Sequence, residues 1–191
     1  MKIYFTDQSE YFPQHLKRLK RESKIDDVCS NLNEKITRIE VRSQTSFDAI
    51  NLAFLFAYKI FPKQIMTFLS EWEFENREMR VGDTIVQQAF IPPFPKISKK
   101  IIFGVRINEI IREKNRVGFS YETLKEHVEM GMSTFTVERD FNSKTIFKIH
   151  TFSKPGNLLT KIAGPFFSVP YQAYCTRQGL INVKRQLENS Q

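Results

Sequence analysis

The chain has 191 residues, of which 41% are hydrophobic and 26% are charged, and its formal net charge is +8. This length suits one domain, and the hydrophobic content excludes a disordered or low-complexity chain. Because 18 residues are phenylalanine and only 7 are glycine, we expect an aromatic interior and no glycine-rich nucleotide-binding loop.

The first 35 residues show no regular pattern except for a short basic helix expected over Tyr11–Lys20, which Pro13 can begin but not continue. We therefore predict an irregular N-terminal extension, residues 1–35, on a single domain formed by residues 36–191. The N-terminus lacks the apolar stretch of a signal peptide, and the most apolar window, Phe47–Phe61, is too short and too polar to span a bilayer. A cytoplasmic protein is expected.

The first half of the main domain has the pattern of a strand followed by helices. Residues Ile36–Arg42 alternate between apolar and polar side chains, as in a strand with one apolar face. Phe47–Phe61 places apolar residues at helical spacing and on the other faces as well, which predicts a buried helix that ends at Pro62. A second short helix is expected over Lys63–Trp72.

The second half alternates with period two and then returns to helical spacing. Five successive strands are predicted: Thr84–Ile91, Ile101–Ile111, Arg116–Thr123, Glu129–Arg139 and Thr145–Phe152. The connections between them are short, so neighbouring strands should be antiparallel. Apolar residues spaced by three and four then predict a long helix over Asn157–Leu187, which Pro165 and Pro170 should kink or interrupt.

This order of elements indicates an α+β fold of the helix-grip type, in which a curved antiparallel sheet wraps around a long C-terminal helix. Folds of this type commonly leave a cavity between the sheet and the helix. A cavity lined by phenylalanine and leucine would suit a small hydrophobic or amphipathic ligand.

One stretch resembles a known family. Residues 118–139 read GFSYETLKEHVEMGMSTFTVER, which contains the pattern G-F-x-Y-x-T-L-x-x-H-x-E-x-G followed by F-x-V-E. The pattern is similar to that of an uncharacterised domain family of bacteria and plants. That family is grouped with START proteins, polyketide cyclases and the birch pollen allergen in a helix-grip superfamily (SRPBCC). The resemblance implies the same fold but no particular activity.

Strand alternation predicts where polar residues meet. Phe119 and Phe135 place the odd-numbered residues of their two strands on the inward face of the sheet. Polar residues of the same parity lie near the turn between these strands, namely Tyr121, Thr123, His127, Glu129 and Ser133. We expect them to converge at one mouth of the cavity and to orient a ligand through hydrogen bonds.

The same residues have two other interpretations. They can hydrogen-bond to one another and stabilise the hairpin, or His127 and Glu129 can act as a general base with its orienting carboxylate. Arg139 ends the inward row, where it can bind a ligand carboxylate or form a salt bridge.

The sequence suggests no metal and no cofactor, because Cys29 and Cys175 lie far apart and the three histidines are dispersed. The favoured function is the binding of a small hydrophobic or amphipathic ligand. The alternatives are an enzyme that uses His127 and Glu129, or a structural or interaction protein with a filled core. Since the basic residues are scattered, nucleic acid is not an expected partner, and contact with a membrane surface is the less favoured alternative. The oligomeric state stays open.

Overall fold

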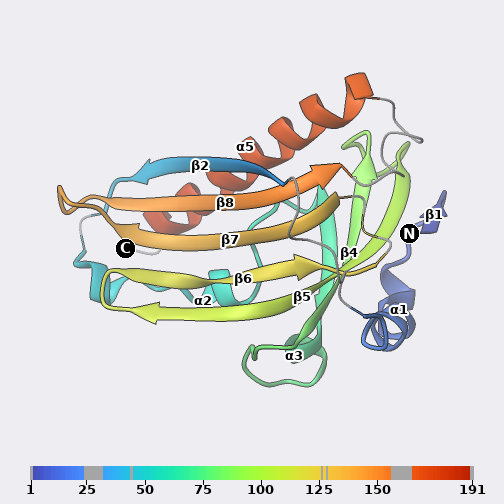
Figure 1. The fold of residues 1–191 in the computed structure, drawn as a ribbon, viewed down its shortest axis with the longest axis horizontal. Helices are drawn as coiled ribbons and strands as arrows, with labels where there is room; N and C mark the ends of the chain where they lie inside the picture. The colour runs from blue at the N-terminus through green and yellow to red at the C-terminus, as the bar shows by residue number, and fades with distance from the viewer. Residues whose placement is uncertain are drawn as a thin grey trace.

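The computed structural model describes residues 2–23, 32–43, 45–125, 127, 129–155 and 165–189. Its main feature is an eight-stranded sheet in the order β2-β8-β7-β6-β5-β4-β3, with β1 paired to β5 (Figure 1). The strands are β1 (Lys2–Tyr4), β2 (Asn33–Val41), β3 (Met66–Ser70), β4 (Thr84–Ile91), β5 (Lys99–Glu113), β6 (Arg116–Thr123), β7 (Glu129–Arg139) and β8 (Thr145–Pro155). The predicted antiparallel meander is therefore confirmed in β4 to β8.

The register of the meander aligns its aromatic residues on one face of the sheet. Phe119 on β6 pairs with Phe135 on β7, and Phe135 pairs with Ile149 on β8. All three side chains are buried in the same hydrophobic cluster. We call this face the inner face. The predicted alternation along β6 and β7 is confirmed, because odd-numbered residues such as Tyr121 and Val137 also belong to that cluster.

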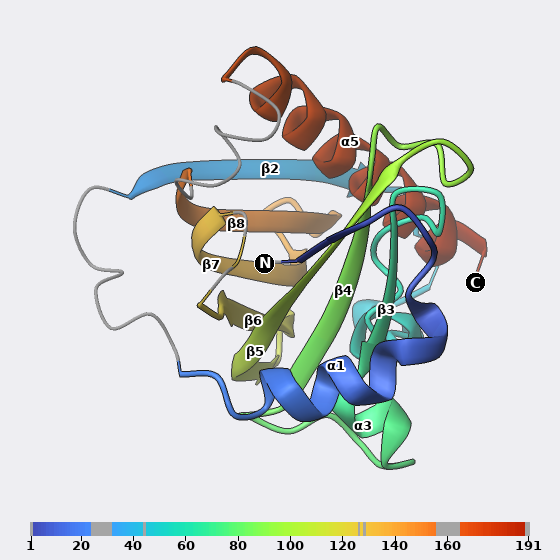
Figure 2. The same cartoon turned by 90° about the vertical axis from the view of Figure 1, so that its right-hand side faces the viewer.

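The inner face is covered by the C-terminal helix α5 (Pro165–Asn189). Figure 2 shows the sheet curving from β2 round to β3, with α5 crossing its open side. Leu180, Val183 and Leu187 on α5 are buried in the cluster of the inner face. A curved antiparallel sheet around a C-terminal helix is the predicted α+β helix-grip fold.

Hydrogen bonds fix the C-terminal half of α5 on both sides. The Asn182 amide donates to the backbone carbonyls of Lys59, at 3.2 Å, and Ile60, at 2.9 Å. On the other side, the Lys184 ammonium donates to the carbonyl of Glu40 on β2, at 3.0 Å. These bonds give partners to backbone carbonyls of the Lys59–Ile60 segment and of the edge strand β2.

The outer face of the sheet is covered by the short helix α1 (Phe12–Leu19). Its residues Leu16 and Leu19 form a second buried cluster with Val86 on β4 and Ile102 on β5. The strand β1, which precedes the helix, adds to the edge of β5. The predicted basic helix thus exists, and the segment that contains it packs against the sheet. The boundary predicted at residue 35 stays a prediction.

The helix predicted over Phe47–Phe61 is wrong. Besides α1, the described residues before β4 form only short helices, which are η1 (Ser9–Tyr11), η2 (Phe47–Ala49), α2 (Ala53–Phe56) and α3 (Glu71–Phe74). The left-handed backbone of Tyr58, with a φ of 57°, turns the chain after α2. Because the segment is apolar on nearly every side, it enters the core as an irregular turn whose shape is set by packing more than by helix propensity.

The helix predicted over Lys63–Trp72 is also wrong. Met66–Ser70 forms the edge strand β3 and pairs with β4. Pairing across the sheet overrides the local preference of such a short segment. The helix α3 then begins after Ser70, whose hydroxyl accepts a hydrogen bond from the Glu73 amide at 3.3 Å.

The terminal helix is confirmed as an element, and Pro170 lies within α5 without ending it. A proline in the second turn removes one hydrogen bond to the first turn, and the rest of the helix can continue. The part of the prediction that covers residues 157–164 lies outside the described residues.

Replacement of Gly118 by alanine should destabilise the sheet. A Cβ atom at this position would overlap the carbonyl oxygen of Phe135 on the neighbouring strand, so the two central strands would have to separate. We expect the free energy of unfolding to fall by about 2–3 kcal/mol. The matched control is Gly104→Ala on β5, whose Cβ would meet only the side-chain ends of Leu19 and Leu124, at 3.0 Å. Urea denaturation of both variants measures the difference, and equal losses would contradict the prediction.

His15 should make the stability depend on pH. Burial, together with the positive charges of Arg18 and Lys2, lowers the pKa of His15 below its ordinary value of 6.5. As the pH falls below that value, the unfolded chain takes up the proton first, so the free energy of unfolding decreases. We expect a His15→Leu variant to gain stability relative to the wild type between pH 8 and pH 5, as measured by urea denaturation at both values.

The control for the His15 experiment is Gln14→Leu on the exposed side of α1. This substitution removes no titrating group, so its stability difference from the wild type should be the same at both pH values. A constant difference for His15→Leu as well would show that His15 does not couple folding to protonation.

Candidate functional site

On β7 and β8, burial along the inner face decreases toward one end of the sheet, whereas Thr123 on β6 stays buried there. Phe135 on β7 and Ile149 on β8 are buried, whereas the next inner-face residues, Ser133 and Thr151, are only half-buried. Thr123 on β6 lies on the same face, because it pairs with the buried Val105. We call Thr123, Ser133 and Thr151 the polar end of the inner face.

The hydroxyl groups of the polar end already form hydrogen bonds within the sheet. The hydroxyls of Ser133 and Thr151 lie 3.1 Å apart, across β7 and β8. The Thr123 hydroxyl accepts a bond from the Gly131 amide at 3.0 Å. Each hydroxyl has one donor and two acceptor positions, so a single bond leaves capacity for another partner. The cluster therefore stabilises the hairpin and can still hydrogen-bond to a ligand.

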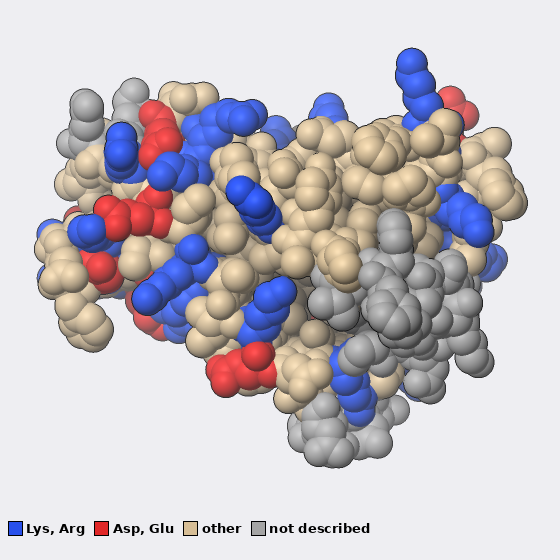
Figure 3. Space-filling view, turned by 90° about the horizontal axis from the view of Figure 1, so that it is seen from above, with Lys and Arg blue, Asp and Glu red and all other residues tan. Residues whose placement is uncertain are grey.

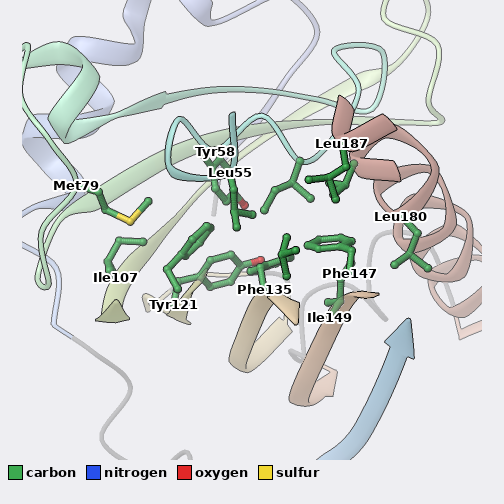
Figure 4. Packing of buried hydrophobic residues seen from close by; sticks show 14 of the residues in the cluster. Leu55, Tyr58, Met79, Ile107, Tyr121, Phe135, Phe147, Ile149, Leu180 and Leu187 are labelled. Carbon is green, nitrogen blue, oxygen red and sulfur yellow. The ribbon is translucent and has the colours of Figure 1, made fainter. Parts of the chain in front are cut away.

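Behind the polar end, Tyr121 belongs to a polar contact inside the core. The Gln87 side chain on β4 donates a hydrogen bond to the Tyr58 hydroxyl, which also bonds to Tyr121. Burial, and then the neighbouring Tyr121, raise the pKa of Tyr58 well above its ordinary value. Figure 4 shows Tyr58 and Tyr121 among the apolar side chains of the cluster. These tyrosines therefore act as neutral hydrogen-bonding groups that link the site to the core.

His127 lies at the same end of the sheet as Thr123. Its ring stands edge-on to the ring of Phe103, with centroids 4.4 Å apart, and its backbone amide bonds to the Leu124 carbonyl at 3.1 Å. Phe103 is buried on β5 in a small cluster with Ala89. The imidazole is thus packed against an aromatic wall. The side chain of Glu129 lies outside the described residues, so the predicted acid–base pair stays a prediction.

Residues 170–178 of α5 are less buried than the residues of its C-terminal half. Between residues 170 and 178 no side chain is buried, and burial begins at Gly179 and Leu180. Gly179 gives room to Phe61, since a Cβ there would lie 3.1 Å from that ring. The hydroxyl of Tyr171 holds this half of the helix to β4 by donating to the Phe90 carbonyl at 2.7 Å.

Arg139 does not join the other candidate residues. It ends β7, and ten residues of extended strand from Glu129 place it about 33 Å away. Its side chain is exposed and lines a surface pocket of about 610 Å³ together with Arg38 and Phe141. Alternation places residues on one face of a strand but does not bring them close together, because each residue adds about 3.3 Å along the strand.

The structure therefore brings together Tyr121, Thr123 and Ser133 and adds three residues that the sequence reasoning missed. Thr151 continues the odd-numbered row of Phe147 and Ile149 on β8, so the same alternation would have found it. Alternation could not have predicted the contact between Tyr58 and Gln87. Tyr58 reaches Gln87 on β4 from an irregular turn, and such a turn has no periodic sequence pattern.

Among the described residues, no group of three or more His, Cys, Asp or Glu side chains is placed to hold a metal ion. In the same part of the chain, no helix is both long and apolar enough to cross a membrane.

The fold and this site define the class of protein, an α+β helix-grip protein with a filled core at one end and a polar end at the other. A model of the family described as a domain of unknown function (DUF1990) matches residues 29–181. The match covers most of the chain, so the protein belongs to this family. The expected membership of an uncharacterised domain family is confirmed.

Solved structures with similar folds share little sequence with this chain. A hypothetical protein of Helicobacter pylori has a TM-score of 0.52 and 9% identity, covering 87% of this chain and 92% of its own. A major latex-like protein of Panax ginseng has a TM-score of 0.46 and 12% identity, covering 82% and 97%. An uncharacterised protein of Rhizobium leguminosarum has a TM-score of 0.47 and 14% identity, covering 83% and 97%. The first likeness shows the fold alone. Comparison with curated proteins finds no match.

Removal of the Tyr58 hydroxyl should destabilise the core. In Tyr58→Phe, the buried Gln87 amide loses its acceptor, which we expect to lower the free energy of unfolding by about 1–3 kcal/mol. Because the cost comes from an unpaired amide, the double variant Tyr58→Phe/Gln87→Leu should recover part of it. Denaturant titration measures both. The control is Tyr11→Phe, which alters an exposed tyrosine and should have no effect. A neutral Tyr58→Phe would refute the proposed role of the hydroxyl.

Proposed function

We propose that the protein binds a small hydrophobic or amphipathic molecule between the polar end of the inner face and residues 170–178 of α5. One observation carries the proposal: burial decreases beyond Phe135 on β7 and Ile149 on β8, and no residue from 170 to 178 of α5 is buried, at the same end of the molecule in Figure 1. An inner-face residue such as Ser133 should be as buried as Phe135 if protein atoms alone covered it. A ligand at this level would complete the covering of the face.

The residues at this level suit a ligand with an apolar body and a polar group. Phe103 and Phe61 supply apolar walls, while Thr123, Ser133 and Thr151 supply hydroxyl groups on a rigid sheet. Sites for small molecules commonly combine such apolar walls with a few placed polar groups. Thr123, Ser133 and Thr151 carry no charge, so recognition by the polar end would rest on hydrogen bonds and apolar contact.

The sequence pattern within residues 118–139 supports the same proposal from a second direction. It resembles a family grouped with START proteins and polyketide cyclases, and membership of that superfamily is part of what we propose. In this interpretation, the packed core between the inner face and the C-terminal half of α5 provides stability, and the polar end provides binding.

A substitution that fills the polar end should remove the binding of an apolar dye. We expect Ser133→Phe to weaken the binding of Nile red at least tenfold, equivalent to about 1.4 kcal/mol, because the new ring occupies the space beside Thr151. The matched control is Thr134→Phe, the next residue on β7, whose side chain points to the outer face. Fluorescence titration gives both affinities, and circular dichroism checks that each variant folds.

Native mass spectrometry of the wild-type protein, followed by solvent extraction, is the companion measurement. A co-purifying small molecule near a one-to-one ratio would support the proposal and give the chemical class of the ligand. The proposal fails if wild-type protein binds no dye and carries no molecule, or if Ser133→Phe and Thr134→Phe bind the dye equally well.

A further inference from the structure

The loop between β4 and β5 exposes apolar side chains to solvent. Phe94 is 60% exposed and Ile97 is 78% exposed, although both belong to residue types that folded proteins usually bury. The loop is ordered by its own bonds. The Phe94 amide donates to the Pro92 carbonyl at 2.7 Å, and the Ile97 amide donates to the Phe94 carbonyl at 3.0 Å. The two side chains are thus held outward by a defined turn.

A third exposed apolar residue lies beside this loop. Phe5, at the end of β1, is 79% exposed. The buried Lys100 ammonium donates to the Phe5 carbonyl at 3.1 Å and to the Ser98 carbonyl at 2.8 Å, so one side chain joins the end of β1 to the end of the loop. We call Phe5, Phe94 and Ile97 the apolar tip. Figure 1 shows β1 and the β4–β5 loop at the same end of the molecule.

The charges around the apolar tip are positive. Lys2, Lys96 and Lys99 are exposed, and none of them forms an ion pair with any residue that the structure describes. The acidic residue nearest in sequence to β1 is Asp7, whose carboxylate is bonded to Ser9. In the face that Figure 3 shows, most acidic side chains lie toward the left-hand end, opposite the end that carries β1 in Figure 1. The tip therefore combines apolar side chains with lysines to which the described part of the chain supplies no acidic partner.

We propose that the apolar tip docks the protein on the surface of an anionic phospholipid bilayer. Aromatic and aliphatic side chains enter the boundary between headgroups and acyl chains, while lysines beside them are attracted to anionic headgroups. The structure supplies both parts at one place, and the net charge of +8 favours approach to such a surface.

The form of the tip favours a bilayer over a protein partner. Its three apolar residues come from the end of a strand and from a loop, so together they form a small projection and not a broad apolar face. Binding sites for proteins usually need a broad patch with a well-packed centre, whereas a bilayer adapts to a projection. The docking does not depend on the ligand proposed above.

Vesicle flotation with the full-length protein tests the proposal. Wild-type protein should float with vesicles of phosphatidylcholine and phosphatidylserine, and more weakly with phosphatidylcholine alone. Replacing both lysines in Lys96→Ala/Lys99→Ala should lower the partition coefficient for the anionic vesicles about 25-fold, since each lysine near such a surface contributes about fivefold. Phe94→Ser/Ile97→Ser should lower it at least about tenfold for both kinds of vesicle.

The matched control is Phe141→Ser, which removes a fully exposed phenylalanine in the turn between β7 and β8, at the opposite end of the molecule in Figure 1. It should bind vesicles as the wild type does. The proposal is overturned if wild-type protein ignores anionic vesicles, or if Phe141→Ser loses as much binding as Phe94→Ser/Ile97→Ser. Self-association that Phe94→Ser abolishes, seen by sedimentation velocity without vesicle binding, would overturn it in favour of a second copy of the chain.

Discussion

The packing of the C-terminal half of α5 on the aromatic inner face is the contact on which the rest of the structure depends. A curved sheet with phenylalanine on one side cannot leave that side in water, and Leu180, Val183 and Leu187 provide the cover. Hydrogen bonds from Asn182 and Lys184 hold the helix in place. Among the described side chains of α5, those before Gly179 are not buried, so the two ends of the inner face are covered differently.

Each face of the sheet is covered by a helix, α5 on the inner face and α1 on the outer face. On the outer face, α1 covers β4 and β5 through Leu16 and Leu19. On the inner face, the filled core gives way to hydroxyl groups at Ser133 and Thr151. A sheet fixed from both sides is rigid, so the hydroxyls at its polar end are held in constant positions. Such preorganisation is useful to a binding site, because little order must be created when a ligand arrives.

The meander and the terminal helix could be predicted because their signals are local and long. Strands β4 to β8 are each eight or more residues long, and their short turns leave little choice of partner. The same alternation correctly placed Tyr121, Thr123 and Ser133 on one face. The helix predicted over Phe47–Phe61 was wrong because this segment is apolar on nearly all sides. The spacing of its apolar residues therefore does not indicate which side is buried. The strand β3 was missed because five residues are too few to show a period.

The fold class, the family and the parity of the strands could be predicted from the residues alone, because each depends on patterns within short stretches of chain. The position at which burial begins on α5, the contact between Tyr58 and Gln87, and the separation of Arg139 from the polar end came from the three-dimensional structure. It also showed that Phe94 and Ile97 are exposed, although an apolar loop sequence would have suggested the core. These properties depend on contacts between residues that are remote in sequence. The curvature of the sheet and the elements that cover it decide which of those contacts form.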